Sequence, residues 1–430
     1  MKIAIVGTGI AGNVAAYHLS REHQVTVFEA NHYVGGHTHT HDIEWNGRNY
    51  ALDSGFIVFN YKTYPHFTKL LADLDVSVQP SSMSFSVRCE RSGLEYNGTT
   101  LNTLFAQRRN LLRPSFYRMI RDILRFNREA PQFLSRPDMT TTLEQYLTQG
   151  RYCDEFIDRY LIPMGAAIWS ADPSQMSVMP AQFFIRFFHN HGMLSVDNRP
   201  AWHVIQGGSK EYVRKLTASF RDRIRTNSPV ENIKRNRTYV TVKVLHQPPE
   251  RFDSIFLATH SDQALRLLSD ATPLEKEVLQ PMTYQQNEAV LHTDEAMLPT
   301  RRRAWAAWNY HIPAHAQSRI AMTYNLNILQ NIHAPVQFCA TLNDNQKISP
   351  RKILKRMIYD HPVFTTKSIV AQLRQAEING INRTYFCGAY WRYGFHEDGV
   401  VSALNALEHF RRSQHYAQLS VRRTGTASAI

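Results

Sequence analysis

Residues 2–12 read Lys2-Ile3-Ala4-Ile5-Val6-Gly7-Thr8-Gly9-Ile10-Ala11-Gly12, and this stretch decides the fold. The unbroken apolar run before the first glycine is typical of a buried parallel strand. The Gly-x-Gly-x-x-Gly pattern then leads into a helical run of small residues. Glycines at these three positions permit a tight turn, the approach of the backbone to a pyrophosphate, and close packing of the helix on the strand.

A second apolar strand, residues 24–28, ends in Glu29. This acid lies about 20 residues after the glycines, where a carboxylate binds the ribose hydroxyls of a dinucleotide. The first helical turn, at Ile10 and Ala11, offers N–H groups and the positive end of the helix dipole to the phosphates. Because strand, turn, helix and acid all have the expected spacing, residues 2–29 are predicted to bind a dinucleotide.

Length and composition favour a chain of two or three domains with substantial cores, since 430 residues include 43% hydrophobic residues. The four cysteines are scattered without a Cys-x-x-Cys pair, so neither a disulfide framework nor a zinc site is indicated. No cleavable segment precedes the first glycine, and no apolar run has the length of a membrane span. These features predict a cytoplasmic protein.

The net charge of +13 gives a basic chain that attracts anionic lipids, nucleic acid or acidic substrates. No nucleic-acid motif stands in its expected context, so no nucleic-acid partner is expected. Residues 114–129 form a basic amphipathic pattern, with Arg118, Arg121, Arg125 and Arg128 on one face. Such a helix can lie on an anionic surface such as the inner membrane face, or it can be an ordinary exposed helix.

The segment after Glu29 carries a second glycine pattern, Glu29-Ala30 followed by Gly35-Gly36. It resembles the second fingerprint of the flavin-containing amine oxidase superfamily, which includes monoamine oxidases, protoporphyrinogen oxidase and carotenoid desaturases. Members of this superfamily usually have arginine after the Gly-Gly pair, near the pyrophosphate, whereas this chain has His37. The sequence Asp53-Ser54-Gly55 resembles the family element at the flavin end of the cofactor. Asp53 is either a structural residue or a ligand contact.

The segment 385–400 resembles the C-terminal flavin motif of the same superfamily. A strand ends at Cys387-Gly388-Ala389, and the pair Asp398-Gly399 follows a short loop at the start of a predicted helix, 400–410. An acid there caps the helix, whose dipole then faces the flavin. The loop has no cysteine, so the resemblance implies FAD bound without a covalent link. It places FAD contacts at Gly7, Gly9, Ile10, Ala11, Gly12, Glu29, Ala30, Gly35, Gly36, His37, Asp53, Gly55, Val230, Gly388, Glu397, Asp398, Gly399 and Val400.

The expected architecture is α/β. A Rossmann-type FAD-binding domain, glutathione reductase-like and of the amine oxidase branch, is combined with a discontinuous α+β substrate domain. The FAD-binding domain is predicted at 1–75, 201–280 and 361–415. The substrate domain is predicted at 76–200 and 281–360, and residues 416–430 are predicted to form a tail.

The resemblance implies an FAD-dependent oxidoreductase that takes hydride from its substrate. Two features differ from simple amine oxidases: the strand 287–292 lacks the family lysine, and Phe395 replaces a tyrosine of the aromatic cage. The chain is most similar to bacterial predicted oxidoreductases that accompany cyclopropane-fatty-acyl synthase-like enzymes. A small-molecule or lipid substrate with a fatty acyl chain is therefore expected. The alternatives are an amine or polyamine oxidase that releases peroxide, and a non-redox lipid carrier.

Histidines raise two further hypotheses. His396 and Tyr393, in the loop before the C-terminal helix, are the candidate catalytic residues, because a histidine there could hold a proton near neutral pH. Alternatively, His396 only makes a hydrogen bond at the helix start. His37, His39 and His41 alternate as on one face of a strand, which could bind a metal, although strand alternation explains them equally well. No metal is expected.

Overall fold

The N-terminal motif lies in a parallel five-stranded sheet. The computed structural model describes residues 1–135, 137–195, 199–315 and 319–425. The sheet has the order β10-β2-β1-β14-β20, and every neighbouring pair is parallel. Its strands are β1 (Lys2–Val6), β2 (Gln24–Phe28), β10 (Ile224–Arg225), β14 (Ser254–Leu257) and β20 (Thr384–Phe386). Three of the five strands therefore come from beyond residue 220, so distant parts of the chain complete this sheet.

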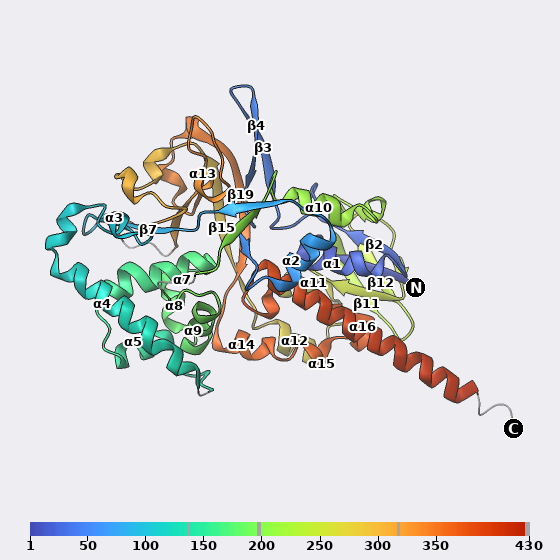
Figure 1. Ribbon diagram of the computed structural model, residues 1–430. Helices are drawn as coiled ribbons and strands as arrows, with labels where there is room; N and C mark the ends of the chain where they lie inside the picture. The colour runs from blue at the N-terminus through green and yellow to red at the C-terminus, as the bar shows by residue number, and fades with distance from the viewer. Residues whose placement is uncertain (136, 196–198, 316–318, 426–430) are drawn as a thin grey trace.

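Both faces of this sheet are covered, as a parallel sheet requires. One face packs on α1 (Ile10–Leu19), α2 (Pro65–Asp73), α10 (Lys210–Thr217) and the long α16 (His396–Gly425). The other face packs on a small antiparallel sheet of β11 (Val230–Arg235), β12 (Val240–Val244) and β13 (Glu250–Phe252), and on α11 (Ser261–Leu267) and α12 (Pro273–Leu279). These elements occupy the right half of the molecule in Figure 1.

A buried ion pair fastens β11 to α12. The side chains of Arg235 and Glu275 are 1% and 0% exposed. Arg235 Nη2 donates to Glu275 Oε2 at 2.8 Å, and Arg235 Nε donates to Asp270 Oδ1 at 2.9 Å. Glu275 Oε2 also accepts the backbone N–H of Thr272 at 2.8 Å, which closes the capping box of α12. The pair therefore joins the small sheet to its covering helix.

A seven-stranded sheet forms the second half of the molecule, with the order β19-β15-β18-β17-β16-β7-β8. Its strands are β7 (Phe85–Cys89), β8 (Leu94–Asn97), β15 (Tyr284–His292), β16 (Trp308–Ile312), β17 (Ala321–Asn325), β18 (Cys339–Leu342) and β19 (Ile353–Pro362). Helices α4 (Pro114–Glu129), α5 (Leu143–Gln149), α7 (Ile162–Trp169), α8 (Pro173–Val178) and α9 (Ala181–Asn190) share one apolar core with it, at the left of Figure 1.

The remaining β structure links the two halves. The hairpin of β3 (Thr40–Trp45) and β4 (Arg48–Asp53) projects at the top of Figure 1. Asn46 and Gly47 both have positive φ, 49° and 73°, as the tight hairpin turn that an Asn-Gly pair favours requires. A three-stranded sheet has the order β5 (Phe59–Asn60), β9 (Trp202–Ile205) and β6 (Val78–Ser81). Along the chain, β6 precedes β7 of the second half, and β9 precedes α10 of the first half. The domain boundaries given above stay a prediction.

The basic pattern at 114–129 forms one helix with those bounds, α4, whereas the C-terminal helix is longer than predicted. Residues 101–129 contain α3 (Leu101–Leu104), the 3-10 helix η1 (Arg108–Leu112) and α4, because Pro114 begins a new helix. The C-terminal helix, expected over 400–410, runs from His396 to Gly425, so the predicted tail is helical as far as 425. The rest of that tail, 426–430, lies outside the described residues.

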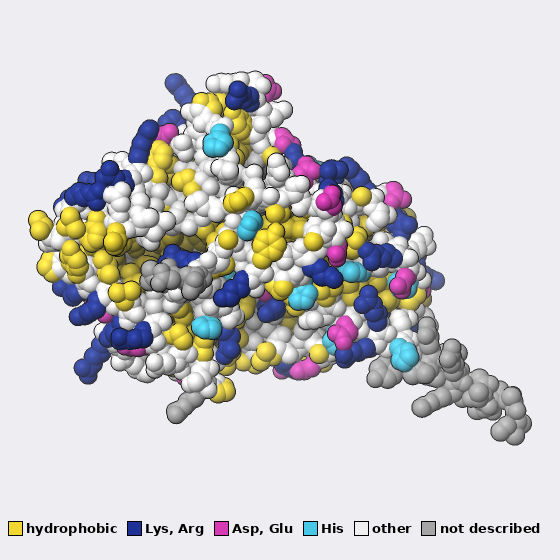
Figure 2. All heavy atoms as spheres, viewed as in Figure 1, with side chains coloured by type: hydrophobic (Ala, Val, Ile, Leu, Met, Phe, Trp, Pro, Cys, Tyr) yellow, Lys and Arg dark blue, Asp and Glu magenta, His cyan; other side chains and the backbone are white. Residues whose placement is uncertain are grey.

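The surface is mainly polar, with Lys and Arg side chains spread over the face in Figure 2. Apolar side chains gather at the left edge of that view, over the end of the molecule that carries α3. Within the described ranges, no helix is both long enough and apolar enough to cross a membrane.

Candidate functional site

Three glycine segments meet at the N-terminus of α1. Gly9 is the N-cap of that helix, and a Cβ added to Gly36 would lie 3.0 Å from the Gly9 Cα. A Cβ added to Gly399, in the first turn of α16, would lie 2.6 Å from Ile10 Cγ2. The predicted cofactor segments at 7–12, 35–36 and 399 are therefore in direct contact, although almost 390 residues separate the first from the last.

The first turn of α1 has the properties of a phosphate site. A Cβ built on Gly12 would lie 2.0 Å from the Gly7 carbonyl oxygen, so only glycine allows this helix to pack on its strand. A Cβ built on Gly9 would meet no atom within 4 Å, so this glycine faces open space. The first turn contains no acidic residue, and its N–H groups have no intrahelical partner. The residues present therefore fit the pyrophosphate of FAD.

Glu29 stands at the end of β2, where the dinucleotide pattern predicts it. Its Oε2 accepts the backbone N–H of Thr8 at 3.0 Å and the Thr8 hydroxyl at 2.5 Å. Its carbonyl accepts the N–H of Ser228 at 2.8 Å, which brings the start of β11, with Val230, beside the strand end. Glu29 and Val230 thus lie in one region, as a site for the adenosine half of FAD requires. Their contacts with FAD stay a prediction.

The carboxylates of Glu397 and Asp398, in the C-terminal motif, accept hydrogen bonds from backbone N–H groups at helix N-termini. Glu397 Oε1 accepts the N–H of His66 at 3.0 Å, and Oε2 accepts the N–H of Phe67 at 2.9 Å, so this carboxylate caps α2. Asp398 Oδ2 accepts the N–H of Phe395 at 2.9 Å, at the start of its own helix. A cofactor contact from these two residues would therefore come from their backbone N–H groups, near Gly399 and Val400.

Asp53 is also held by protein groups. Its Oδ1 accepts the Ser209 hydroxyl at 2.7 Å and the Thr40 hydroxyl at 2.5 Å, and its Oδ2 accepts the Gln330 side-chain amide at 3.1 Å. The residue is fully buried. Of the two roles considered for Asp53, these contacts favour the structural one, since they tie β4 to the start of α10.

The segment after Asp53 packs tightly on His37. A Cβ on Gly55 would lie 2.1 Å from the His37 carbonyl oxygen, and the Phe56 N–H donates to that same oxygen at 2.8 Å. The His37 ring contacts His361 and His260, with ring centroids 5.5 and 6.3 Å away. Burial, together with His260, lowers the pKa of His37 to about 4, so this imidazole is neutral.

His396 is enclosed at the start of α16. Its ring stacks on Phe56, with centroids 3.7 Å apart and planes 9° apart. Its Nε2 lies 2.7 Å from the Tyr212 hydroxyl and 3.2 Å from the Thr38 hydroxyl. Burial lowers the pKa of His396 well below its ordinary value. A neutral, stacked and hydrogen-bonded ring favours a positioning role, which leaves direct proton transfer by His396 as an untested prediction.

Tyr393 belongs to a group of rings that we call the aromatic wall. It consists of Phe183 and Phe187 from α9 together with Phe364, Tyr393 and Phe395. Tyr393 lies 4.8 Å from Phe183, and Phe395 stacks on Phe187 at 5.1 Å between centroids. Phe395 directly precedes His396, so the wall adjoins the C-terminal cofactor motif. The apolar segment 176–193 therefore supplies both core and wall.

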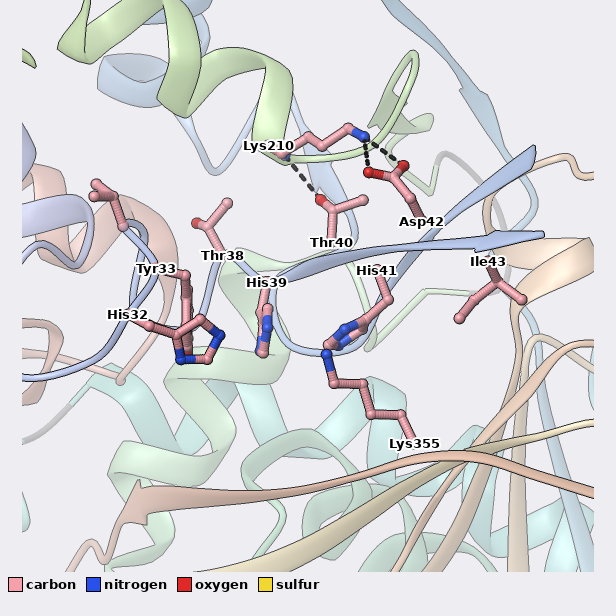
Figure 3. Close-up of a pocket in the computed structure, with 11 residues that line it drawn as sticks. His32, Tyr33, Thr38, His39, Thr40, His41, Asp42, Ile43, Lys210 and Lys355 are labelled. Carbon is pink, nitrogen blue, oxygen red and sulfur yellow. Dashed lines mark hydrogen bonds and ion pairs between the residues drawn. The ribbon is translucent and has the colours of Figure 1, made fainter. Parts of the chain in front are cut away.

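A cavity of about 340 Å³ lies beside β3. Figure 3 shows the rings of Tyr33, His39 and His41 in a row, with Lys355 at the far end. Centroids are 4.0 Å apart for Tyr33 and His39, and 4.1 Å apart for the two histidines. Burial and Lys355 lower the pKa of His39 to about 4. Within the described part of the chain, no group of three His, Cys, Asp or Glu is arranged to hold a metal.

Several residues of this region were not predicted from sequence. Thr8, the middle residue of the glycine motif, also accepts the N–H of Gly35 at 3.2 Å and so joins two fingerprints. Asn287, fully buried on the strand that lacks the family lysine, donates to His361 Nδ1 at 2.9 Å. Spacing gives no signal for His260 or His361, because each comes from a different element of the fold.

Asp398 predicts a measurable pH dependence. Burial raises its pKa to about 7, whereas an unfolded aspartate has a pKa of about 4. Between these values the unfolded chain releases a proton that the folded chain keeps, so stability falls as pH rises from about 4 to 7. Asp398→Asn removes this slope, worth about 1.4 kcal/mol per pH unit at most. Urea unfolding of both proteins across this range checks it. Parallel curves would contradict the assignment.

Comparisons with known proteins agree with this geometry. The family model described as "Flavin containing amine oxidoreductase" matches residues 10–306. No curated protein sequence matches the chain. Among the solved structures that share the fold are three at 14–15% identity. Cyclohexylamine oxidase from Brevibacterium oxydans IH-35A has a TM-score of 0.69, covering 97% of this chain and 99% of that one.

A fatty acid isomerase from P. acnes that produces CLA has a TM-score of 0.67 and 15% identity, covering 95% of this chain and 98% of its own. Putrescine oxidase bound to putrescine has a TM-score of 0.65 and 15% identity, with 96% and 99% covered. The family model spans well over half of the chain. The chain therefore has the α/β fold of these structures, belongs to the flavin-containing amine oxidoreductase family and is an FAD-dependent oxidoreductase.

Proposed function

We propose that this FAD-dependent oxidoreductase takes hydride from an apolar substrate that carries a fatty acyl chain. The observation behind the proposal is the aromatic wall and the charges around it. Five rings adjoin the C-terminal cofactor motif, of which Phe183, Phe187 and Phe364 are buried in the core. We propose that a carbon chain packs against these rings. Fatty acyl chains suit such a surface better than polar amines do.

The charges beside Tyr393 support an anionic or neutral substrate. Burial raises the pKa of Tyr393, while the nearby cations Arg186 and Arg392 act in the opposite direction. Asp398 lies 3.6 Å from Arg392 and offsets part of its charge. A diamine would bring further positive charge toward these arginines, whereas the carboxylate or phosphate of a lipid would be attracted to them.

The chain's own residues would orient the substrate. When bound, FAD would accept the hydride as a carbon–carbon double bond forms. The second hydrogen would leave the substrate as a proton to the Tyr393 hydroxyl oxygen, whose own proton passes to solvent. Tyr393 carries a hydroxyl on the wall and is the proposed catalytic residue. His396 is proposed to position the start of α16 through Phe56 and Tyr212. The wall excludes water from the reacting carbons.

The fold alone does not select the substrate. Among proteins that share it, one acts on a fatty acid and others act on cyclohexylamine or putrescine. Amine oxidation is therefore the main alternative, and peroxide release with amines would be its signature.

Anaerobic bleaching of the flavin absorbance tests the proposal. We expect detergent-dispersed fatty acyl lipids to bleach it, and putrescine and cyclohexylamine to leave it unchanged over the same time. Tyr393→Phe should slow the bleaching by at least about tenfold and keep the bound FAD. Faster bleaching by amines than by any lipid would overturn the proposed substrate class. Full activity of the Tyr393→Phe variant would remove its assigned role.

A further inference from the structure

An unusual group of apolar side chains stands exposed at the end of the molecule that carries α3. Leu101, Leu111 and Leu112 are 77%, 47% and 88% exposed, and we call them the leucine tip. Tyr117, itself 47% exposed, joins them by donating its hydroxyl to the Leu111 carbonyl at 3.0 Å. Figure 2 shows apolar side chains gathered over this end. Contiguous exposed apolar surface of this kind marks an interaction site.

Side-chain contacts with the backbone hold the leucine tip in place. Arg108 Nη1 donates to the Phe105 carbonyl at 3.1 Å, and Arg113 Nη2 donates to the Ser92 carbonyl at 3.2 Å. Thr100 and Thr103 form a capping box at the start of α3. The leucines therefore project from short helices that these hydrogen bonds hold in place.

A basic rim, formed by arginines of η1, α4 and the 3-10 helix η6 (Arg302–Ala304), adjoins the tip. Residues 101–129 contain seven arginines and two acids. On α4 the side chains of Arg118, Arg121 and Arg128 are 51%, 71% and 74% exposed. Helix η6 packs beside α3 and adds further arginines. Arg118, Arg121 and Arg128 each pair with an acid, and Arg125 shares Asp122 with Arg121. Arg108, Arg109 and Arg113 are described without an acidic partner, so the net charge of residues 101–129 is positive.

The apolar face of α4 is not available for this contact. Phe116, Met119 and Phe126 are buried in the core of the second half of the molecule, which extends to the aromatic wall. The membrane hypothesis drawn from the amphipathic pattern of 114–129 therefore does not hold for that face. The exposed apolar surface lies instead at the leucine tip, and Leu124, 53% exposed, lies farther along the arginine-bearing face.

We propose that the leucine tip inserts into the surface of an anionic lipid bilayer, with the surrounding arginines on the headgroups. Apolar residues rimmed by cations match the layering of such a surface, since acyl chains lie beneath phosphates. A symmetric contact with a second copy would instead bring two arginine rims together. The proposal rests on the proposed function, because a membrane would supply the substrates that carry fatty acyl chains. The test of the proposal measures vesicle binding and does not depend on turnover.

Vesicle binding by the flavin-loaded full chain tests the inference. We expect it to cosediment with vesicles of equimolar phosphatidylglycerol and phosphatidylcholine, and more weakly with phosphatidylcholine alone. Leu111→Ser/Leu112→Ser should weaken binding on the order of 10- to 100-fold, because two inserted leucines are lost. Arg121→Gln/Arg128→Gln should weaken it by about tenfold. The single variant Leu112→Ser, at the most exposed position, repeats the test if the double variant does not fold.

Matched variants serve as controls. Leu373→Ser removes a leucine that is 80% exposed elsewhere, and Arg214→Gln/Arg266→Gln removes two exposed, ion-paired arginines. Both should bind vesicles as the unmodified chain does. A polarity-sensitive dye on Leu112→Cys should shift to the blue on binding, and one on Leu373→Cys should not.

Three results would overturn the insertion. Vesicle binding by the leucine variants that is as strong as that of the unmodified chain refutes the proposal. If only the arginine variant loses vesicle binding, the chain binds the headgroups electrostatically and the leucines do not insert. A dimer in sedimentation that the leucine variants abolish, without vesicle binding, shows that a second copy covers the tip. Vesicle binding without bleaching by detergent-dispersed lipids refutes the proposed substrate and leaves the leucine tip supported.

Discussion

Replacing Gly9 by alanine will leave the fold intact and weaken FAD binding by on the order of 100-fold, equivalent to about 3 kcal/mol. The added methyl group meets no protein atom within 4 Å, so the apoprotein has no reason to rearrange. It would occupy the space in which the pyrophosphate approaches the first turn of α1. Titration of the apoprotein with FAD measures the affinity, and thermal unfolding without FAD measures the fold.

Gly98→Ala is the matched control. A Cβ at Gly98 also meets nothing within 4 Å, but this residue lies after β8, away from the glycine cradle. It should bind FAD with unchanged affinity. If Gly9→Ala bound FAD as tightly as Gly98→Ala does, the phosphates would not lie over this turn, and the assignment of the cradle would be wrong.

The second large effect concerns stability. Arg235→Met leaves Glu275 buried without its cation, and should lower the free energy of unfolding by about 3–5 kcal/mol. The double variant Arg235→Met/Glu275→Gln removes the stranded charge and keeps an acceptor for the N–H of Thr272. It should therefore regain a large part of the loss. Urea unfolding of the three proteins gives the comparison.

An exposed ion pair provides the reference for this experiment. Arg266 and Asp262 lie four residues apart on the chain, with side chains 70% and 41% exposed. Arg266→Met should cost less than about 1 kcal/mol, because water screens such pairs. Equal losses for Arg235→Met and Arg266→Met would mean that burial does not strengthen the Arg235–Glu275 contact.

Local patterns predicted the elements that hold the cofactor. The apolar run of β1, the glycine spacing and the acid at the end of β2 are all encoded within short stretches, so strand, turn and helix could be assigned from them. The approach of Gly36 to Gly9, and of Gly399 to Ile10, could be expected only from the family resemblance. No periodicity in a single segment could have placed them together.

Side-chain partners were harder to predict, because they come from distant segments. Glu397 caps a helix that begins more than 300 residues earlier, and Asp53 meets the start of α10. The same limit applies to exposure. Leu111 and Leu112 form an apolar pair of the kind that usually enters a core, and only the packing of η1 and α4 leaves them in solvent.

The start of α1 lies against both Gly36 and Gly399, and this has a consequence for how the protein is made. The ribosome adds Gly399 more than 360 residues after Gly36. Until then β14 lacks its neighbour β20, and α1 lacks its contact with α16. We therefore expect stable binding of FAD only after residue 399 has been synthesised, and until then the edge of the parallel sheet at β14 stays unpaired.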